Sequence, residues 1–199
     1  LCPYCSFNRF PFAEERAVPY FKNLRREMMM VKELGYDFDS LYIGGGTPTA
    51  IPCGELERVL AAAQRAFPGA AEWTVEAGRP DCTTPEKLAA IREGGATRIS
   101  INPQTLSDEV LRAIGRRHTA QDVVDCFAAA RKAGHRNINM DLIAGLPLDT
   151  PAGFEKSLAG VLALSPENVT VHTLTLKRAS NLVMQAAPPA YGDVAQMVQ

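Results

Sequence analysis

Two cysteines three positions apart are the first residues whose types and spacing could do chemistry. Cys2 and Cys5 enclose Pro3 and Tyr4 at the start of the chain. Such a pair can form half of a zinc site, carry out thiol–disulfide exchange, or supply two thiolates to an iron–sulfur cluster. No second Cys-x-x-Cys and no paired histidines follow, which disfavours zinc. The spacing alone leaves all three chemistries open.

A glycine-rich turn is the second candidate. Gly44, Gly45, Gly46 and Thr47 directly follow a short apolar run, and Pro48 stiffens the exit. Three glycines allow the backbone to approach a ligand closely, and exposed amides and carbonyls could hold the ammonium or carboxylate of an amino-acid ligand. A tight turn without a ligand is the alternative, but a turn rarely needs three glycines.

Two carboxylates fall within apolar runs, where a charge needs a partner. Glu76 ends one run, and its partner could be the hydroxyls of a ribose or the nearby side chain of Arg79. Asp141 lies inside another run and should face a site or a basic residue. Arg116 and Arg117 are candidates to reach Asp141 or a ligand carboxylate.

Gln104 closes a further predicted strand, where it could hydrogen-bond a ligand or only cap the strand. The remaining polar candidates are weaker. The three histidines show no metal-ligand spacing, so we expect them on the surface or in the core. The other cysteines are expected to be small buried or loop residues, and they are Cys53, Cys82 and Cys126.

Strands must alternate with helices to position these groups. The apolar pattern predicts strands at 40–43, 73–77, 98–102, 137–143 and 169–176, and helices at 14–34, 55–67, 85–93, 108–114, 120–133 and 151–164. This α/β alternation predicts a parallel sheet with helical cover. We expect a barrel and not a Rossmann sheet, because no Gly-x-Gly-x-x-Gly turn follows an early strand. In barrels the carboxyl ends of the strands share one face, so the candidate residues should converge there.

Composition sets the broad class of the protein. The chain has 199 residues, is 46% hydrophobic and carries a formal charge of -1, as expected for one domain without a nucleic-acid or anionic-membrane footprint. No apolar run is long enough to span a bilayer, and no signal peptide is evident. Five cysteines with one close pair favour a reducing cytoplasm over a secreted disulfide framework. The chain is expected to be the core of something longer.

Three motifs together resemble those of radical S-adenosylmethionine proteins. They are Cys2-Pro3-Tyr4-Cys5-Ser6-Phe7, Tyr42-Ile43-Gly44-Gly45-Gly46-Thr47-Pro48-Thr49 and Asn139-Met140-Asp141-Leu142-Ile143-Ala144-Gly145-Leu146-Pro147. Within that family they are similar to the oxygen-independent coproporphyrinogen III oxidase-like group of HemN, HemW and HemZ relatives. Segments 75–81, 99–105 and 171–178 look most like the HemZ branch. The resemblance extends from Leu1 to about Leu182.

The resemblance implies a partial (β/α)6 TIM-like barrel over residues 1–182, truncated at both ends, with its first strand and first cluster cysteine missing. Residues 183–199 would be a linker or the start of a C-terminal region. It also implies a [4Fe-4S] cluster and S-adenosyl-L-methionine, whose one-electron cleavage gives a 5′-deoxyadenosyl radical that abstracts a substrate hydrogen. The expected activity is that of an oxygen-independent coproporphyrinogen III dehydrogenase, which decarboxylates propionates to vinyls in heme biosynthesis. Related cores act as heme chaperones or heme methyltransferases, and the core alone does not separate them.

Site residues follow from the same resemblance. Cys2 and Cys5 would bind the cluster. The implied cofactor contacts are Tyr4 near the cluster, Gly45, Gly46 and Thr47 at the methionyl group, Glu76 near the ribose, Gln104, Arg116 and Asp141 elsewhere on the cofactor, and Thr175 beside the adenine. A tetrapyrrole substrate and an electron-donor protein are the implied partners, with no nucleic acid and no membrane span.

Overall fold

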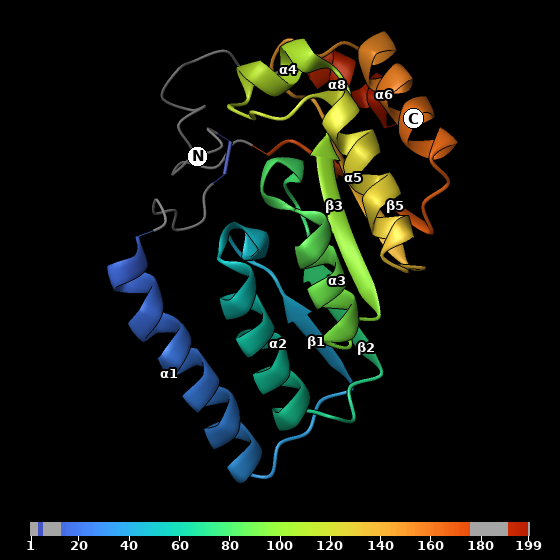
Figure 1. Cartoon of the computed structure of the whole chain (residues 1–199). Coiled ribbons are helices and arrows are strands. Elements are labelled where there is room, and N and C mark those ends of the chain that lie inside the picture. The colour runs from blue at the N-terminus through green and yellow to red at the C-terminus, as the bar shows by residue number, and fades with distance from the viewer. Residues whose placement is uncertain (1–3, 6–12, 176–190, 199) are drawn as a thin grey trace.

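Five parallel strands form one sheet in the computed structural model, which describes residues 4–5, 13–175 and 191–198 (Figure 1). The strands are β1 (Ser40–Ile43), β2 (Glu72–Glu76), β3 (Arg98–Gln104), β4 (Ile138–Ala144) and β5 (Asn168–Thr173). They lie side by side in chain order. A doubly wound sheet reverses its strand order at a switch point, and this sheet does not. The α/β class and the barrel-type winding are thus confirmed.

Helices connect the strands, and most begin where the sequence predicts. They are α1 (Glu14–Glu33), α2 (Cys53–Ala66), α3 (Pro85–Glu93), α4 (Asp108–Ala113), α5 (Ala120–Lys132), α6 (Pro151–Ala163) and α8 (Tyr191–Met197), with 3-10 turns η1 (Pro48–Ala50) and η2 (Pro80–Cys82). A capping box opens α5, because Thr119 and Asp122 each accept a hydrogen bond from the other's backbone N–H. Thr84 caps α3 by accepting from the Lys87 N–H.

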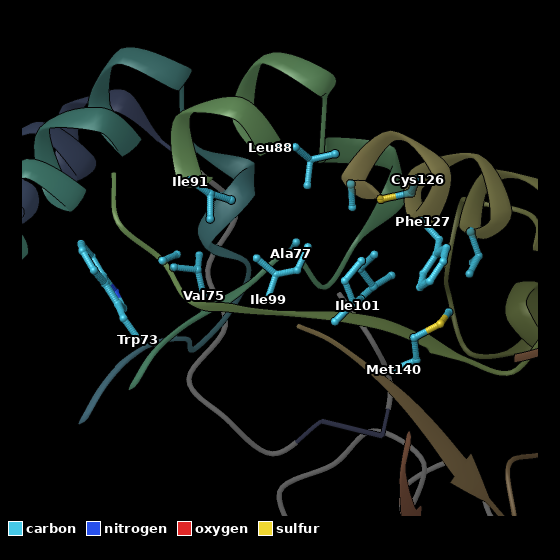
Figure 2. Close-up of a cluster of buried hydrophobic side chains, with 14 of the residues drawn as sticks. Trp73, Val75, Ala77, Leu88, Ile91, Ile99, Ile101, Cys126, Phe127 and Met140 are labelled. Atoms are coloured by element: carbon cyan, nitrogen blue, oxygen red, sulfur yellow. The ribbon is translucent and has the colours of Figure 1, made fainter. Parts of the chain in front are cut away.

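The two faces of the sheet differ in chemistry. Val75, Ile99, Ile101 and Met140 are fully buried toward the helices (Figure 2), where Leu88 and other side chains of α2, α3 and α5 complete the core. Since strand side chains alternate between faces, the residues between them point the other way. Those residues form what we call the polar face, consisting of Tyr42, Glu76, Ser100, Asn139, Asp141, Thr170 and His172. Parallel sheets usually bury apolar side chains on both faces, so a polar face indicates a site.

Helix α8 closes the carboxyl end of β4. It packs against α6, and Val194 is buried over Gly145, the residue that follows the strand. The Gly145 N–H donates to Met197 Sδ at 3.2 Å. The sequence patterns did not anticipate this helix within the 183–199 stretch.

Candidate functional site

The glycine turn leaves space beside its backbone. Gly45 has a φ of +115°, and a Cβ on Gly45 or Gly46 would meet nothing within 4 Å. Thr47 ends the turn, and its hydroxyl donates to the Gly46 carbonyl at 2.6 Å. The turn therefore presents open, glycine-lined backbone at the carboxyl end of β1, as a site for close backbone approach requires.

Glu76, at the carboxyl end of β2, accepts a hydrogen bond from a side chain of the neighbouring strand β1. The Tyr42 hydroxyl donates to Glu76 Oε1 at 2.5 Å, and the Gly45 N–H is a second donor. Burial raises the pKa of Glu76 above its usual value, and the hydrogen bond from Tyr42 opposes that rise. Sequence reasoning considered Arg79 as the partner and missed Tyr42. The sequence does carry a signal for Tyr42: it lies two residues before Gly44, and residues two apart in a strand point to the same face of the sheet.

Asp141 sits in a hydrogen-bonded row that crosses the polar face. Asn139 Nδ2 donates to Asp141 Oδ1 at 2.5 Å and to Ser100 Oγ at 3.0 Å. The Thr170 hydroxyl donates to Asn139 Oδ1 at 2.9 Å. The row joins β3, β4 and β5, so the Asp141 carboxylate is fixed by its neighbours in the sheet.

The basic groups that act on Asp141 are not those expected. Burial raises the pKa of Asp141, while the charges of His172 and Arg98 lower it. His172 Nε2 lies 4.0 Å from Asp141 Oδ2. The expectation of Arg116 or Arg117 in this role rested on sequence order alone. Asp141 in turn raises the pKa of Glu76, so the two carboxylates are close enough to repel each other.

An irregularity in the pairing of β3 with β4 sets the backbone conformation of Gln104. The register shifts between Ile101 and Gln104, and Gln104 adopts a φ of 71°, unusual for a residue with a side chain. It is 7% exposed, and its Oε1 has no hydrogen-bond partner among the described residues. An unpaired buried acceptor is costly, so this geometry suits a ligand that brings a donor.

Arg116 joins the cysteine segment to the sheet. Its Nη1 donates to the Gly78 carbonyl at 3.2 Å, and its Nη2 donates to the Tyr4 hydroxyl at 3.0 Å. Cys5 follows Tyr4 and is a free, partly exposed thiol. Cys2 lies outside the described residues. The hydrogen bond between Arg116 and Tyr4 thus connects the described part of the predicted cluster-binding segment, Tyr4 and Cys5, to the loop after α4.

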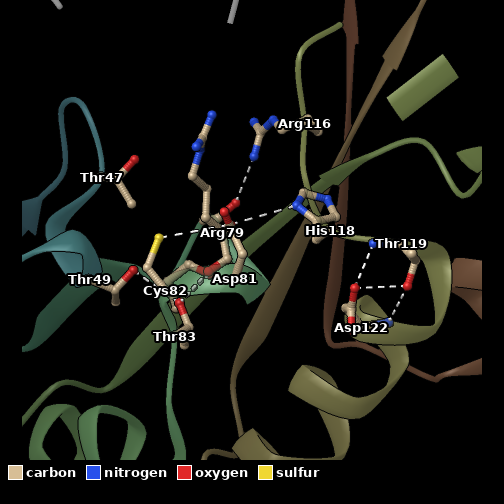
Figure 3. Close-up of polar contacts among 12 residues, drawn as sticks. Thr47, Thr49, Arg79, Asp81, Cys82, Thr83, Arg116, His118, Thr119 and Asp122 are labelled. Carbon is tan, nitrogen blue, oxygen red and sulfur yellow. Dashed lines mark hydrogen bonds and ion pairs between the residues drawn. The ribbon is translucent and has the colours of Figure 1, made fainter. Parts of the chain in front are cut away.

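The loops after β1 and β2 brace each other (Figure 3). The Thr83 hydroxyl donates to the Arg79 carbonyl at 2.8 Å and shares a hydrogen bond of 3.0 Å with the Thr49 hydroxyl. Lys87 Nζ reaches from α3 to the Thr49 carbonyl at 2.6 Å and the Cys82 carbonyl at 3.1 Å. These contacts fix the glycine turn relative to the end of β2.

His118 lies beneath the same loops. Its side chain is fully buried, and Nδ1 is 4.0 Å from Asp81 Oδ1. Burial, and then the charge of Arg116, lowers the pKa of His118, so the neutral imidazole is favoured. The buried, neutral ring of His118 therefore lies between the loop that carries Arg116 and the turn η2.

The polar groups of the site can be compared with what the cofactors implied by the resemblance would need. Among residues 4–5, 13–175 and 191–198, no three His, Cys, Asp or Glu side chains form a metal site. Open glycine backbone, the carboxylates of Glu76 and Asp141, and a Gln104 oxygen without a partner among the described residues lie on neighbouring strands, and the Cys5 thiol follows Tyr4, which Arg116 binds. This combination suits a zwitterionic nucleoside beside a thiolate-bound cluster. The residues present therefore fit these groups.

Other expected positions are less informative. Thr175 is exposed two positions beyond β5. Burial raises the pKa of Cys126 to about 12, and burial also raises those of Cys53 and Cys82, so these thiols are poor thiolate ligands. In the part of the chain that the structure describes, no helix is long and apolar enough to cross a membrane.

Known proteins are similar to this chain in sequence. The family model described as the radical SAM superfamily matches residues 1–159. HemZ of Bacillus subtilis (strain 168), named an oxygen-independent coproporphyrinogen-III oxidase-like protein, is 41% identical over 190 residues, covering 91% of this chain and 38% of HemZ. The heme chaperone HemW of the same organism is 34% identical over 182 residues, covering 89% of this chain and 48% of HemW.

A solved structure shows the same fold. Coproporphyrinogen III oxidase (HemN) from Escherichia coli, described as a radical SAM enzyme, superposes with a TM-score of 0.84 at 25% identity, covering all of this chain and 48% of that one. The chain thus spans less than half the length of each of these three relatives. On sequence and fold together, the chain belongs to the radical SAM superfamily, within the group of HemN, HemW and HemZ proteins.

Proposed function

We propose that the chain is the core of a radical S-adenosylmethionine enzyme of the coproporphyrinogen III dehydrogenase type, which converts propionates to vinyls in heme biosynthesis. One observation carries the proposal. The open turn at Gly45, the carboxylate of Glu76 and the Gln104 oxygen, which has no partner among the described residues, lie at the carboxyl ends of β1, β2 and β3, and the Asp141 carboxylate in the middle of β4 is close enough to act on Glu76. The 41% identity to HemZ supports the choice of reaction.

The roles of the residues follow from their chemistry. Cys2 and Cys5 would bind a [4Fe-4S] cluster through thiolates. Gly45, Gly46 and Thr47 would contact the methionyl group of S-adenosylmethionine, Glu76 and Asp141 would accept hydrogen bonds from it, and Arg116 would hold Tyr4 beside the cysteines. Thr175 would lie near the adenine. Bound together, the cluster and S-adenosylmethionine would supply the one-electron chemistry that removes a hydrogen atom from the substrate.

The partners belong to the same proposal. A tetrapyrrole with propionate side chains would be the substrate, and a separate protein would donate electrons. Neither nucleic acid nor a membrane is needed for this chemistry, and the cytoplasm is the proposed location.

A heme chaperone is the second candidate, because the heme chaperone HemW of Bacillus subtilis is 34% identical to 89% of this chain. Such a protein would share the core and bind heme without decarboxylating a substrate. Conversion of coproporphyrinogen III to protoporphyrinogen IX supports the enzyme, whereas stoichiometric heme binding without turnover supports the chaperone.

The cofactor class has its own test. Anaerobic reconstitution of the full-length protein should give a product that contains iron and sulfide and cleaves S-adenosylmethionine. Cys5→Ala should abolish the cluster absorbance and leave the far-ultraviolet circular dichroism unchanged. Cys53→Ala, at the start of α2, is the matched control and should keep the absorbance. Zinc without iron or sulfide in the wild type would refute the proposal.

A further inference from the structure

The ring of Tyr42 lies over the first residue of the glycine turn. A Cβ on Gly44 would clash with Tyr42 Cε1, and it would lie 2.9 Å from Tyr42 Cδ1 and 3.2 Å from Glu76 Cδ. Contacts as short as the first two do not occur in folded proteins, so only glycine at position 44 lets the ring lie there. The glycine, the ring and the carboxylate therefore form one packed unit at the ends of β1 and β2.

The hydrogen bonds of this unit all converge on Glu76. The Tyr42 hydroxyl lies 2.5 Å from Oε1, and the Gly45 N–H donates to the same carboxylate. Partial desolvation of the hydroxyl, and then its hydrogen bond to Glu76, raises the pKa of Tyr42, so the phenol keeps its proton and acts as the donor. A carboxylate has about four acceptor positions, so two donors orient it and leave positions for a ligand.

We propose that Tyr42 is a positioning residue that aims the Glu76 carboxylate at the vicinal hydroxyls of a bound nucleoside. The inference rests on the proposed function, because it takes the ligand of Glu76 to be the ribose of S-adenosylmethionine. Tyr42 makes no contact with the reacting atoms in this role. Tyr42 as a whole is 63% exposed on the polar face, so removing its hydroxyl leaves the buried core unchanged.

If the Tyr42–Glu76 hydrogen bond only stabilised the packing of β1 against β2, a different outcome would be expected. Losing such a bond lowers the free energy of unfolding but affects ligands with and without ribose hydroxyls equally. A positioning residue changes the preference between those ligands, because a misaimed carboxylate loses hydrogen bonds only to the hydroxyls. The decisive quantity is thus a ratio of affinities.

The probes are S-adenosylhomocysteine and its analogue that lacks both ribose hydroxyls, each titrated calorimetrically into the anaerobically reconstituted full-length protein. We expect the wild type to prefer the ribose ligand at least tenfold, as for hydrogen bonds to a charged group. Tyr42→Phe should reduce that preference to about threefold or less. Tyr42→Phe in a Glu76→Gln background should change it no further. An unchanged preference in Tyr42→Phe, or independent losses in the double variant, would overturn the inference.

A second readout needs no ligand. The carboxyl pKa of Glu76, followed by carbon-13 NMR, should rise in Tyr42→Phe because the hydrogen bond that lowers it is gone. Tyr36→Phe removes an exposed hydroxyl before β1 and should change neither readout. An unchanged Glu76 pKa in Tyr42→Phe overturns the inference alone, whereas a wild type that fails to bind either probe overturns the proposed function.

Discussion

Arg116 Nη2 donates a 3.0 Å hydrogen bond to the hydroxyl of Tyr4, although the two residues are 112 positions apart. The same guanidinium binds the Gly78 carbonyl through Nη1 at 3.2 Å. One planar side chain therefore connects the residue before Cys5 to the loop that follows Glu76. The position of the cysteine segment relative to the polar face depends on this connection.

Arg116→Lys should weaken S-adenosylmethionine binding about tenfold while leaving the fold intact. Lysine keeps the charge but lacks the planar fork that reaches two acceptors at once, so one of the two contacts is lost. Calorimetric titration of the reconstituted protein measures the effect. Arg112→Lys, an exposed change in the last turn of α4, is the control. Equal affinity in both variants would show that the Arg116 fork does not position the site.

Lys87→Met should loosen the glycine turn and lower the free energy of unfolding by about 1–3 kcal/mol. The Thr49 and Cys82 carbonyls would each lose a charged donor. Amide exchange should accelerate at Ala50, whose N–H donates to the Thr47 carbonyl at 3.0 Å. Hydrogen-exchange mass spectrometry and urea denaturation test both effects.

Lys132→Met, in the exposed last turn of α5, is the control for that change. Both variants remove one positive charge, so only the contacts of Lys87 distinguish them. If exchange at Ala50 is as slow in Lys87→Met as in Lys132→Met, the brace does not hold the turn.

Local signals were enough to predict most elements. Ser40–Ile43 was expected as a strand with the bounds the structure has, and the helix expected at 120–133 begins at Ala120 as α5. The strand-end rule also placed Glu76, which is the last residue of β2, whereas Asp141 lies in the middle of β4. These features depend on residues close together in the chain.

The features that were missed depend on the sheet register and on packing between distant segments. Tyr42 lies beside Thr74 in the ladder, and this register brings its hydroxyl to Glu76. The positive φ of Gln104 follows from the register shift between β3 and β4. Helix α8 is fixed by Val194 packing on Gly145, about fifty positions earlier, which no local pattern encodes.

Gly145→Ala should destabilise the protein by about 1–3 kcal/mol. Its φ of +87° is strained for a side chain, and a Cβ there would lie 2.7 Å from Val194 Cγ2. Gly35→Ala is the matched control, because Gly35 has a φ of +84° and nothing within 4 Å of the added Cβ. Thermal unfolding should show a greater loss for Gly145→Ala, and equal losses would mean that α8 does not press on this turn.

The buried His118 should make stability depend on pH. Burial and Arg116 lower its pKa in the folded protein, so the unfolded chain binds more protons below about pH 6.5. The contribution of His118 to the free energy of unfolding should therefore fall as the pH drops below that value and be fully present above it.

His118→Phe and His118→Asn both remove the titrating group, one with an apolar and one with a polar replacement. Urea denaturation between about pH 5 and 7 should show a slope reduced by up to about 1.4 kcal/mol per pH unit in both variants, the contribution of one proton. A slope equal to that of the wild type in both would mean that His118 titrates alike in the folded and unfolded chains.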